Sequence, residues 1–202
     1  ICACLVGSEM CIRDRIEAVN VRRFEPVIPE PIKKETIQKF DVSRPKIALG
    51  IRLPKLDVTG EAATKLTLAA DILADILFGE QTDWYQNLYN KGIIDTEFET
   101  SFDLMHAYQF VSFFAETTEY DALTAAIQSQ IAQYKTILAH AESAFESLRR
   151  ATLGEGIQRL NALESIALRG DDVLFGTNLF DKVMLLQDLT YSDILDLSLI
   201  HI

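Results

Sequence analysis

The sequence predicts an α+β fold, in which helices pack on one face of a mostly antiparallel sheet. Two segments with strand patterns, residues 32–40 and 46–53, precede a long amphipathic segment at 59–78. A second strand pair follows at 98–104 and 107–116, and the remaining chain has helical periodicity. Grouped strands and helices, rather than strictly alternating ones, are typical of α+β domains.

Residues 46–53 form the most apolar of the expected strands. The run Lys-Ile-Ala-Leu-Gly-Ile-Arg-Leu is nearly continuous in apolar residues, and Pro54 follows it. A strand without polar alternation is typical of a position buried on both faces. We therefore expect this strand to be central in the sheet.

Capping signals mark two helices. For the helix at 59–78 we expect Thr59 as N-cap and Gly79 at the C′ position, where glycine often ends helices. For the short helix at 83–90 we expect Asp83 as the cap and Gly92 as the end.

Apolar residues at every second position predict a hairpin of residues 98–104 and 107–116, with its turn at 105–107. We expect its large side chains in the core: Phe98, Phe102, Leu104, Tyr108, Phe110 and Phe114.

Helices are expected throughout the C-terminal part of the chain. Thr118 with Asp121, and Thr190 with Asp193, have the spacing of a capping box. Between them lie helical segments at about 119–138, 141–160 and 178–187. The last helix is expected to start at Thr190. Because the excluded C-terminal residues begin at Ser198, we expect this helix to be cut short.

Composition excludes several classes of protein. The chain has 49% hydrophobic and 24% charged residues, as expected for a globular protein, and contains no run long enough to span a membrane. Its net charge of −11 disfavours binding to nucleic acid, because phosphate backbones are also negative. Cys2, Cys4 and Cys11 all lie near the N-terminus, so the body offers neither disulfides nor thiolate ligands. This composition is compatible with a cytoplasmic protein.

The two ends of the chain differ from its body. Residues 1–15 and 198–202 resemble translated sequencing-adaptor read-through, so we exclude them from the expected fold. Residues 16–31 read as the end of a preceding domain followed by a linker, because Phe-Glu-Pro-Val-Ile-Pro-Glu-Pro holds three prolines. The remaining domain is expected at 32–197.

The stretch 84–95, Trp-Tyr-Gln-Asn-Leu-Tyr-Asn-Lys-Gly-Ile-Ile-Asp, resembles the L-x-x-x-G-L-x signature of insulinase/pitrilysin-type zinc metallopeptidases. Residues 72–79 and 179–190, the aromatic hairpin and the proline-rich linker occur in the order expected for that family. The resemblance covers about residues 16–197 and is to the C-terminal, non-zinc domain, here truncated. It is closest to bacterial insulinase-like proteins associated with elongation factor P modification.

The resemblance implies zinc in an N-terminal domain, and no cofactor in this chain. The family's H-x-x-E-H motif, in which two histidines reach one metal, is absent. His106 and His140 are 34 positions apart, and we interpret them as a turn residue and a helix-end residue.

The resemblance also implies an arginine and a tyrosine near the glycine signature that contact the substrate carbonyl. Here Tyr89 and Asp95 occupy the corresponding positions, and neither has the required chemistry. No residue is therefore assigned to catalysis, substrate binding or metal binding.

Other polar motifs are interpreted as structural. Gly154-Glu155-Gly156 lies within a helical pattern, unlike a phosphate loop. We expect Glu142, Glu146 and Glu155 to be solvated, Asp171 and Asp172 to lie in a loop, and Trp84 to pack in the core.

These expectations combine into one hypothesis and two alternatives. The chain would be the non-catalytic C-terminal domain of an insulinase-like peptidase, inactive alone, that helps to enclose a peptide substrate. Its partner would be a missing N-terminal zinc domain or a homologous subunit, with no role for nucleic acid or membrane. The alternatives are a pseudo-peptidase scaffold that binds a partner without any catalytic half, and an unrelated α+β domain.

Overall fold

A computed structural model of the chain describes residues 35–54, 58–104, 109–164, 166, 171–172 and 176–201. Contacts divide the chain into two units, Ile1–Lys34 and Glu35–Ile202, and all described residues lie in the second. The turn expected at 105–107, with His106, and the predicted linker lie outside the described residues.

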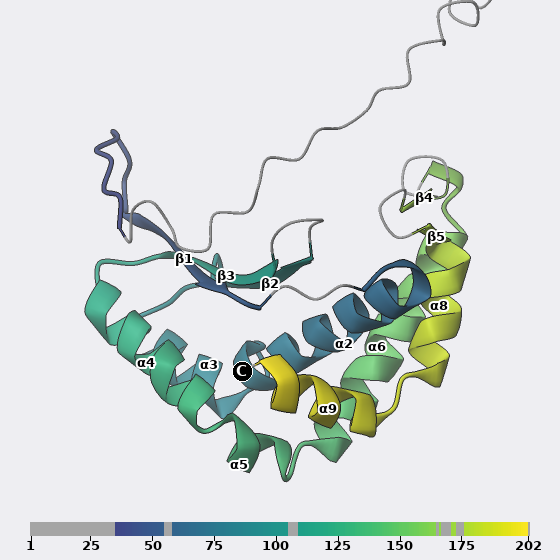
Figure 1. The fold of residues 1–202 in the computed structure, drawn as a ribbon. Helices are drawn as coiled ribbons and strands as arrows, with labels where there is room; N and C mark the ends of the chain where they lie inside the picture. Colours follow the sequence, from purple (N-terminus) through teal and green to yellow (C-terminus); the bar gives the residue numbers. More distant parts are fainter. Residues whose placement is uncertain are drawn as a thin grey trace, which may run out of the picture. The chain divides into compact units, whose positions relative to one another are not determined.

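The described elements confirm the expected α+β class (Figure 1). In chain order they are β1 (Lys46–Arg52), α2 (Gly60–Phe78), α3 (Asp83–Asn90), β2 (Glu99–Leu104), β3 (Gln109–Glu116), α4 (Tyr120–Ala132), α5 (Tyr134–Leu138), α6 (Glu142–Leu160), β4 (Asp171–Asp172), β5 (Thr177–Asn178), α8 (Leu179–Asp188) and α9 (Tyr191–His201).

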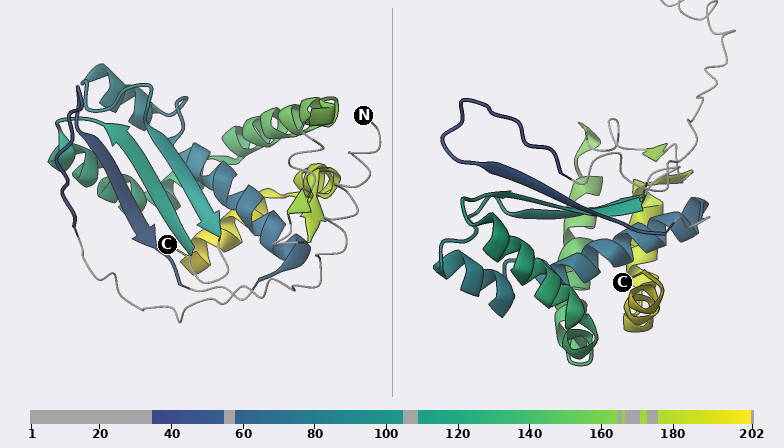
Figure 2. Two further views of the ribbon diagram at one scale, coloured as in Figure 1. Left: turned by 90° about the horizontal axis from the view of Figure 1, so that it is seen from above. Right: turned by 60° about the vertical axis from the view of Figure 1, so that its left-hand side comes forward.

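An antiparallel sheet of order β1-β3-β2 forms one layer, and helices lie against one of its faces (Figure 2). Leu49 faces Phe113 and Phe102 faces Val111, so these four side chains point toward the helices. Helix α2 is central among those helices, since it packs against β2, α6, α8 and α9. The helical layer therefore buries one face of the sheet.

The core is richest in aromatic residues where α2 and α3 meet the sheet. The Phe113 ring meets the Phe78 ring edge-on at 5.0 Å, and Trp84 meets Phe78 at 5.2 Å. Trp84 also contacts Phe98 and donates its indole N–H to the Ala126 carbonyl at 3.3 Å. The expectation that Trp84 packs in the core is confirmed.

Strand β1 is an edge strand among the described residues, so the prediction of a central, doubly buried strand is wrong. Ala48, Gly50 and Ile51 are exposed, although the sequence around them is apolar. The predicted strand at 32–40 is also wrong where it is described, because residues 35–40 have no regular secondary structure. Among the described residues, β1 therefore pairs with β3 alone.

The sequence predicted the positions of the helices more accurately than it predicted their N-cap residues. Thr59 makes no side-chain cap bond on α2, and Thr82 rather than Asp83 caps α3 by accepting from Tyr85 N at 3.1 Å. Glu119, not Thr118, precedes α4, and its N–H donates to the Thr117 hydroxyl instead. Short polar side chains offer several local bonds, so spacing alone does not select one.

Gly79 ends α2 for a steric reason. Its φ of −63° is not left-handed, so the C′ geometry expected from the sequence is wrong. A Cβ at Gly79 would lie 2.4 Å from the Asp75 carbonyl oxygen, which no side chain can accept. Gly92, which follows α3, does adopt a positive φ of 70°.

Helix α9 closes the helical layer. Thr190 donates its N–H and hydroxyl to the Asp193 carboxylate at 2.8 Å each, as its capping-box spacing predicts. Lys65 of α2 also contacts that carboxylate at 2.7 Å, and Tyr191 donates its hydroxyl to the Leu138 carbonyl. The expectation that this helix is cut short is wrong, because it continues to His201.

Candidate functional site

The face of the sheet opposite the helices carries exposed, half-buried and buried side chains. Alternate residues of β3 lie on this face, among them the exposed Phe114 and the buried Ser112, while Phe113 between them faces the helices. Phe114 is 45% exposed, so the expectation that it belongs to the core is wrong, whereas Phe110 is half-buried. The register shows that they share the face of Ala48 and Gly50, which we call the open sheet face.

Polar contacts organise the open sheet face. The hydroxyl groups of Ser101 and Ser112 lie 2.7 Å apart, and Ser101 also donates to the Asp103 carboxylate at 3.0 Å. Lys46 of β1 pairs with Glu116 of β3 at 2.6 Å, and this hydrogen bond raises the lysine pKa. Small side chains thus occupy the middle of the face, between charged ends.

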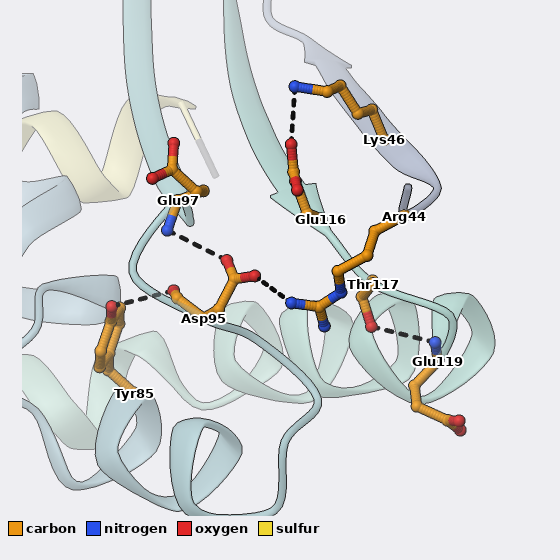
Figure 3. Close-up of polar contacts among 8 residues, drawn as sticks. All are labelled: Arg44, Lys46, Tyr85, Asp95, Glu97, Glu116, Thr117 and Glu119. Carbon is orange, nitrogen blue, oxygen red and sulfur yellow. Dashed lines mark hydrogen bonds and ion pairs between the residues drawn. The ribbon is translucent and has the colours of Figure 1, made fainter. Parts of the chain in front are cut away.

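Asp95, the residue that the sequence resemblance sets against a tyrosine, connects the α3–β2 loop to the segment before β1 (Figure 3). Arg44 donates to one carboxylate oxygen at 2.6 Å, and the Glu97 N–H donates to the other at 3.0 Å. The Tyr85 hydroxyl donates to the Asp95 carbonyl at 3.2 Å. Both carboxylate oxygens are therefore engaged in holding the loop, which is a structural role.

Tyr89, the residue that the sequence resemblance sets against an arginine, lies on the exposed side of α3. It is 44% exposed, and its ring lies parallel to that of Tyr85 at 6.2 Å. A neutral phenol in this position offers one hydroxyl instead of a cationic fork. The geometry of Tyr89 and Asp95 gives no carbonyl-binding pair.

A cavity of about 320 Å³ lies between α2, α6 and α8. Leu68, Val183 and Leu186 supply apolar wall, and Asp71 and Lys182 supply charge. Asp71 keeps one side open to solvent, but the surrounding protein removes enough water to raise its pKa to about 7, and Asp75 and Asp103 add repulsion. No sequence pattern indicates this cavity, because its walls come from α2 and α8, which are about 110 residues apart, and from α6 between them.

The remaining polar candidates have structural surroundings. Glu146 pairs with Arg149 at 2.9 Å, and Glu155 with Arg159 at 3.6 Å, each on the surface of α6. Gly156 faces Val183 of α8, since a Cβ there would lie 3.2 Å from that side chain. The expected loop at Asp171 and Asp172 is instead strand β4, paired with β5.

The described residues do not fit a zinc site. No group of three or more His, Cys, Asp or Glu side chains within these ranges could hold a metal ion. His140 is exposed between α5 and α6, where its N–H donates to the Ile137 carbonyl, as expected for a helix-end residue. Nor is any helix in the described part both long and apolar enough to cross a membrane.

Comparison with known proteins finds a sequence relative and several similar solved structures. No protein-family model matches the chain. It is 29% identical over 177 residues to the uncharacterized zinc protease YmfH of Bacillus subtilis (strain 168), covering 87% of this chain and 41% of that protein. An M16-like peptidase structure from Alicyclobacillus acidocaldarius superposes with a TM-score of 0.67 at 23% identity, covering 80% of this chain and 39% of that one.

A protease structure from Helicobacter pylori superposes with a TM-score of 0.63 at 19% identity, covering 88% of this chain and 45% of that one. The fold is therefore the one found in these peptidase chains. The chain spans less than half the length of each protein that it matches.

Proposed function

We propose that this chain is the non-catalytic C-terminal domain of an insulinase-like zinc metallopeptidase, in which it helps to enclose a peptide substrate. In this proposal the domain extends over residues 32–197, and zinc belongs to an N-terminal domain or a homologous subunit. The chain alone hydrolyses no peptide. We place it in the bacterial branch associated with elongation factor P modification.

The open sheet face is the observation that carries this proposal. Helices cover one face of the sheet, whereas the other carries the exposed residues Ala48, Gly50 and Phe114. Ser101, which is half-buried, and Ser112, which is buried, lie between them. Small side chains let an extended backbone approach the sheet closely, and an exposed aromatic ring provides apolar contact for a passing side chain. Such a surface suits the wall of a chamber that holds unfolded peptides of varied sequence.

The comparisons support the missing zinc domain. The relatives are described as proteases, YmfH specifically as a zinc protease, and each is more than twice as long as the matched segment. The described part of this chain offers no zinc ligand cluster, so the metal would have to be held elsewhere. Tyr89 and Asp95 do not form a carbonyl-binding pair, and in this proposal a partner subunit provides one.

The source gene upstream of codon 16 tests the proposal directly. We expect a continuous reading frame that encodes a homologous domain with an H-x-x-E-H motif and a downstream glutamate. A continuous frame for that domain without the motif would contradict the peptidase assignment. It would instead favour the alternative, a pseudo-peptidase scaffold that binds a partner.

A further inference from the structure

The free edge of β1 has backbone groups directed away from the sheet. Leu53 donates its N–H to Gln109 at 2.8 Å, and Thr117 donates to Pro45 at 3.0 Å, between residues directly opposed in the register. Bonded pairs alternate along an antiparallel ladder, so the odd-numbered residues of β1 bond to β3. The N–H and C=O groups of Lys46, Ala48 and Gly50 therefore point to the edge at which no described strand pairs with β1.

The segment before β1 leads back along this edge. The chain bends at Ser43 and Arg44 and turns back from the start of β1, as the dark purple trace in Figure 2 shows. Arg44 is fixed by its ion pair with Asp95, which holds the base of the turn. The arm that precedes it, residues 35–41, is exposed along its whole length and has no regular secondary structure.

The charges of the arm and of β1 match in one register. Glu35 and Asp41 are six residues apart, as are Lys46 and Arg52. An antiparallel pairing that opposes Asp41 to Lys46 also opposes Glu35 to Arg52. The connection is then residues 42–45, a four-residue loop of a common hairpin length. Opposite charges on directly opposed residues stabilise a strand pair.

The same register brings apolar side chains together. It opposes Phe40, which is 73% exposed, to Ile47 on the helix side of the sheet, and Thr36 to the exposed Ile51. It also places Ile37, which is 80% exposed, opposite Gly50 on the open sheet face, where the glycine leaves room. Large exposed side chains thus become covered in the register that pairs the charges.

We propose that residues 35–41 are an edge strand that closes onto the free edge of β1 as the first strand of a hairpin. Closure gives β1 a hydrogen-bonded neighbour along both of its edges. It also occupies the edge that would otherwise accept an extended peptide or a second copy of the chain. Pairing of residues 35–41 with β1 therefore excludes other strands from this edge, and this consequence does not depend on the proposed function.

A disulfide between engineered cysteines tests the register in the full chain, with Cys2, Cys4 and Cys11 replaced by serine. Thr36→Cys with Ile51→Cys places two cysteines at a non-hydrogen-bonded pair, where the Cα atoms come within disulfide range. Ile37→Cys with Ile51→Cys is the control, because its two side chains lie on opposite faces of the sheet. We expect an intramolecular disulfide in the first variant at least about tenfold faster than in the second.

Mass spectrometry of the oxidised protein distinguishes the outcomes. Equal rates in the two variants, or no disulfide in either, would overturn the proposed register. A disulfide formed only between two chains would also overturn it, because the occupant of the edge would then be a second copy.

Amide exchange at Ala48 and Gly50 gives an independent readout without cysteines. Asp41→Asn removes the proposed ion pair with Lys46. Ser43→Lys is the control, because it changes the net charge of the chain by the same amount but lies in the turn. We expect about twofold to fivefold faster exchange in Asp41→Asn alone, as for the loss of one surface ion pair. Full exposure of both amides in the unaltered chain would contradict closure.

Discussion

Replacing Phe113 or Phe114 by alanine compares the two faces of the sheet at adjacent positions of one strand. Phe113 is 1% exposed, lies 5.0 Å from the Phe78 ring and 6.5 Å from the Phe98 ring, and faces the helices. Phe114 is 45% exposed on the open sheet face. The two variants remove the same atoms, so the difference between them measures the surroundings.

The structure predicts a large difference in stability. Phe113→Ala leaves a cavity in the core and should lower the free energy of unfolding by about 3–5 kcal/mol. Loss of the edge-on contact with Phe78 favours the upper part of that range. Phe114→Ala loses only partial burial, about 1 kcal/mol.

Urea unfolding followed by far-UV circular dichroism gives both values, and unchanged slopes would show that the transitions are comparable. Equal costs for the two variants would refute the reasoning, because Phe114 would then have to be covered as well as Phe113. A cost below about 2 kcal/mol for Phe113→Ala would contradict its place in the core.

Three further perturbations test other parts of the structure. The raised pKa of Asp71 means that the folded state binds the Asp71 proton more tightly than the unfolded state does, so the contribution of this group to stability falls as pH rises from about 4 to 7. Asp71→Asn should flatten that part of a curve of unfolding free energy against pH. An unchanged curve would contradict the cavity environment of Asp71. Gly79→Ala should cost about 1–3 kcal/mol in thermal or urea unfolding, because its Cβ would meet the Asp75 carbonyl, and a neutral effect would disprove that contact. Arg44→Ala should lower the free energy of unfolding by no more than about 1 kcal/mol, because its ion pair with Asp95 is partly solvated. A larger loss in the same measurement would contradict this estimate for the Arg44–Asp95 pair.

Sequence patterns predicted the elements of the fold more successfully than their surroundings. Helix α2 and the hairpin of β2 and β3 were predicted because the periodicity of apolar residues is a local signal. The central position expected for β1 was wrong, because strand order depends on partners distant in sequence. Residues 35–40 illustrate the same limit, since a strand pattern there is not paired in the structure.

The candidate site was only partly accessible to sequence reasoning. The residues at the family's arginine and tyrosine positions, Tyr89 and Asp95, could be identified from the glycine signature, but the contact between Arg44 and Asp95 spans 51 positions and left no local pattern. The open sheet face was missed because Phe110 and Phe114 alternate as core residues do. Alternation predicts which residues share a face, but it does not say which face the helices cover.

Reconstitution of peptidase activity tests the central claim most directly. The purified chain, the zinc domain expected upstream in its gene, and a mixture of the two would be assayed with a fluorogenic extended peptide, with and without a chelator. We predict no hydrolysis by this chain, little by the zinc domain, and chelator-sensitive hydrolysis by the mixture. Hydrolysis by this chain alone, or hydrolysis by the zinc domain that this chain leaves unchanged, would contradict the account.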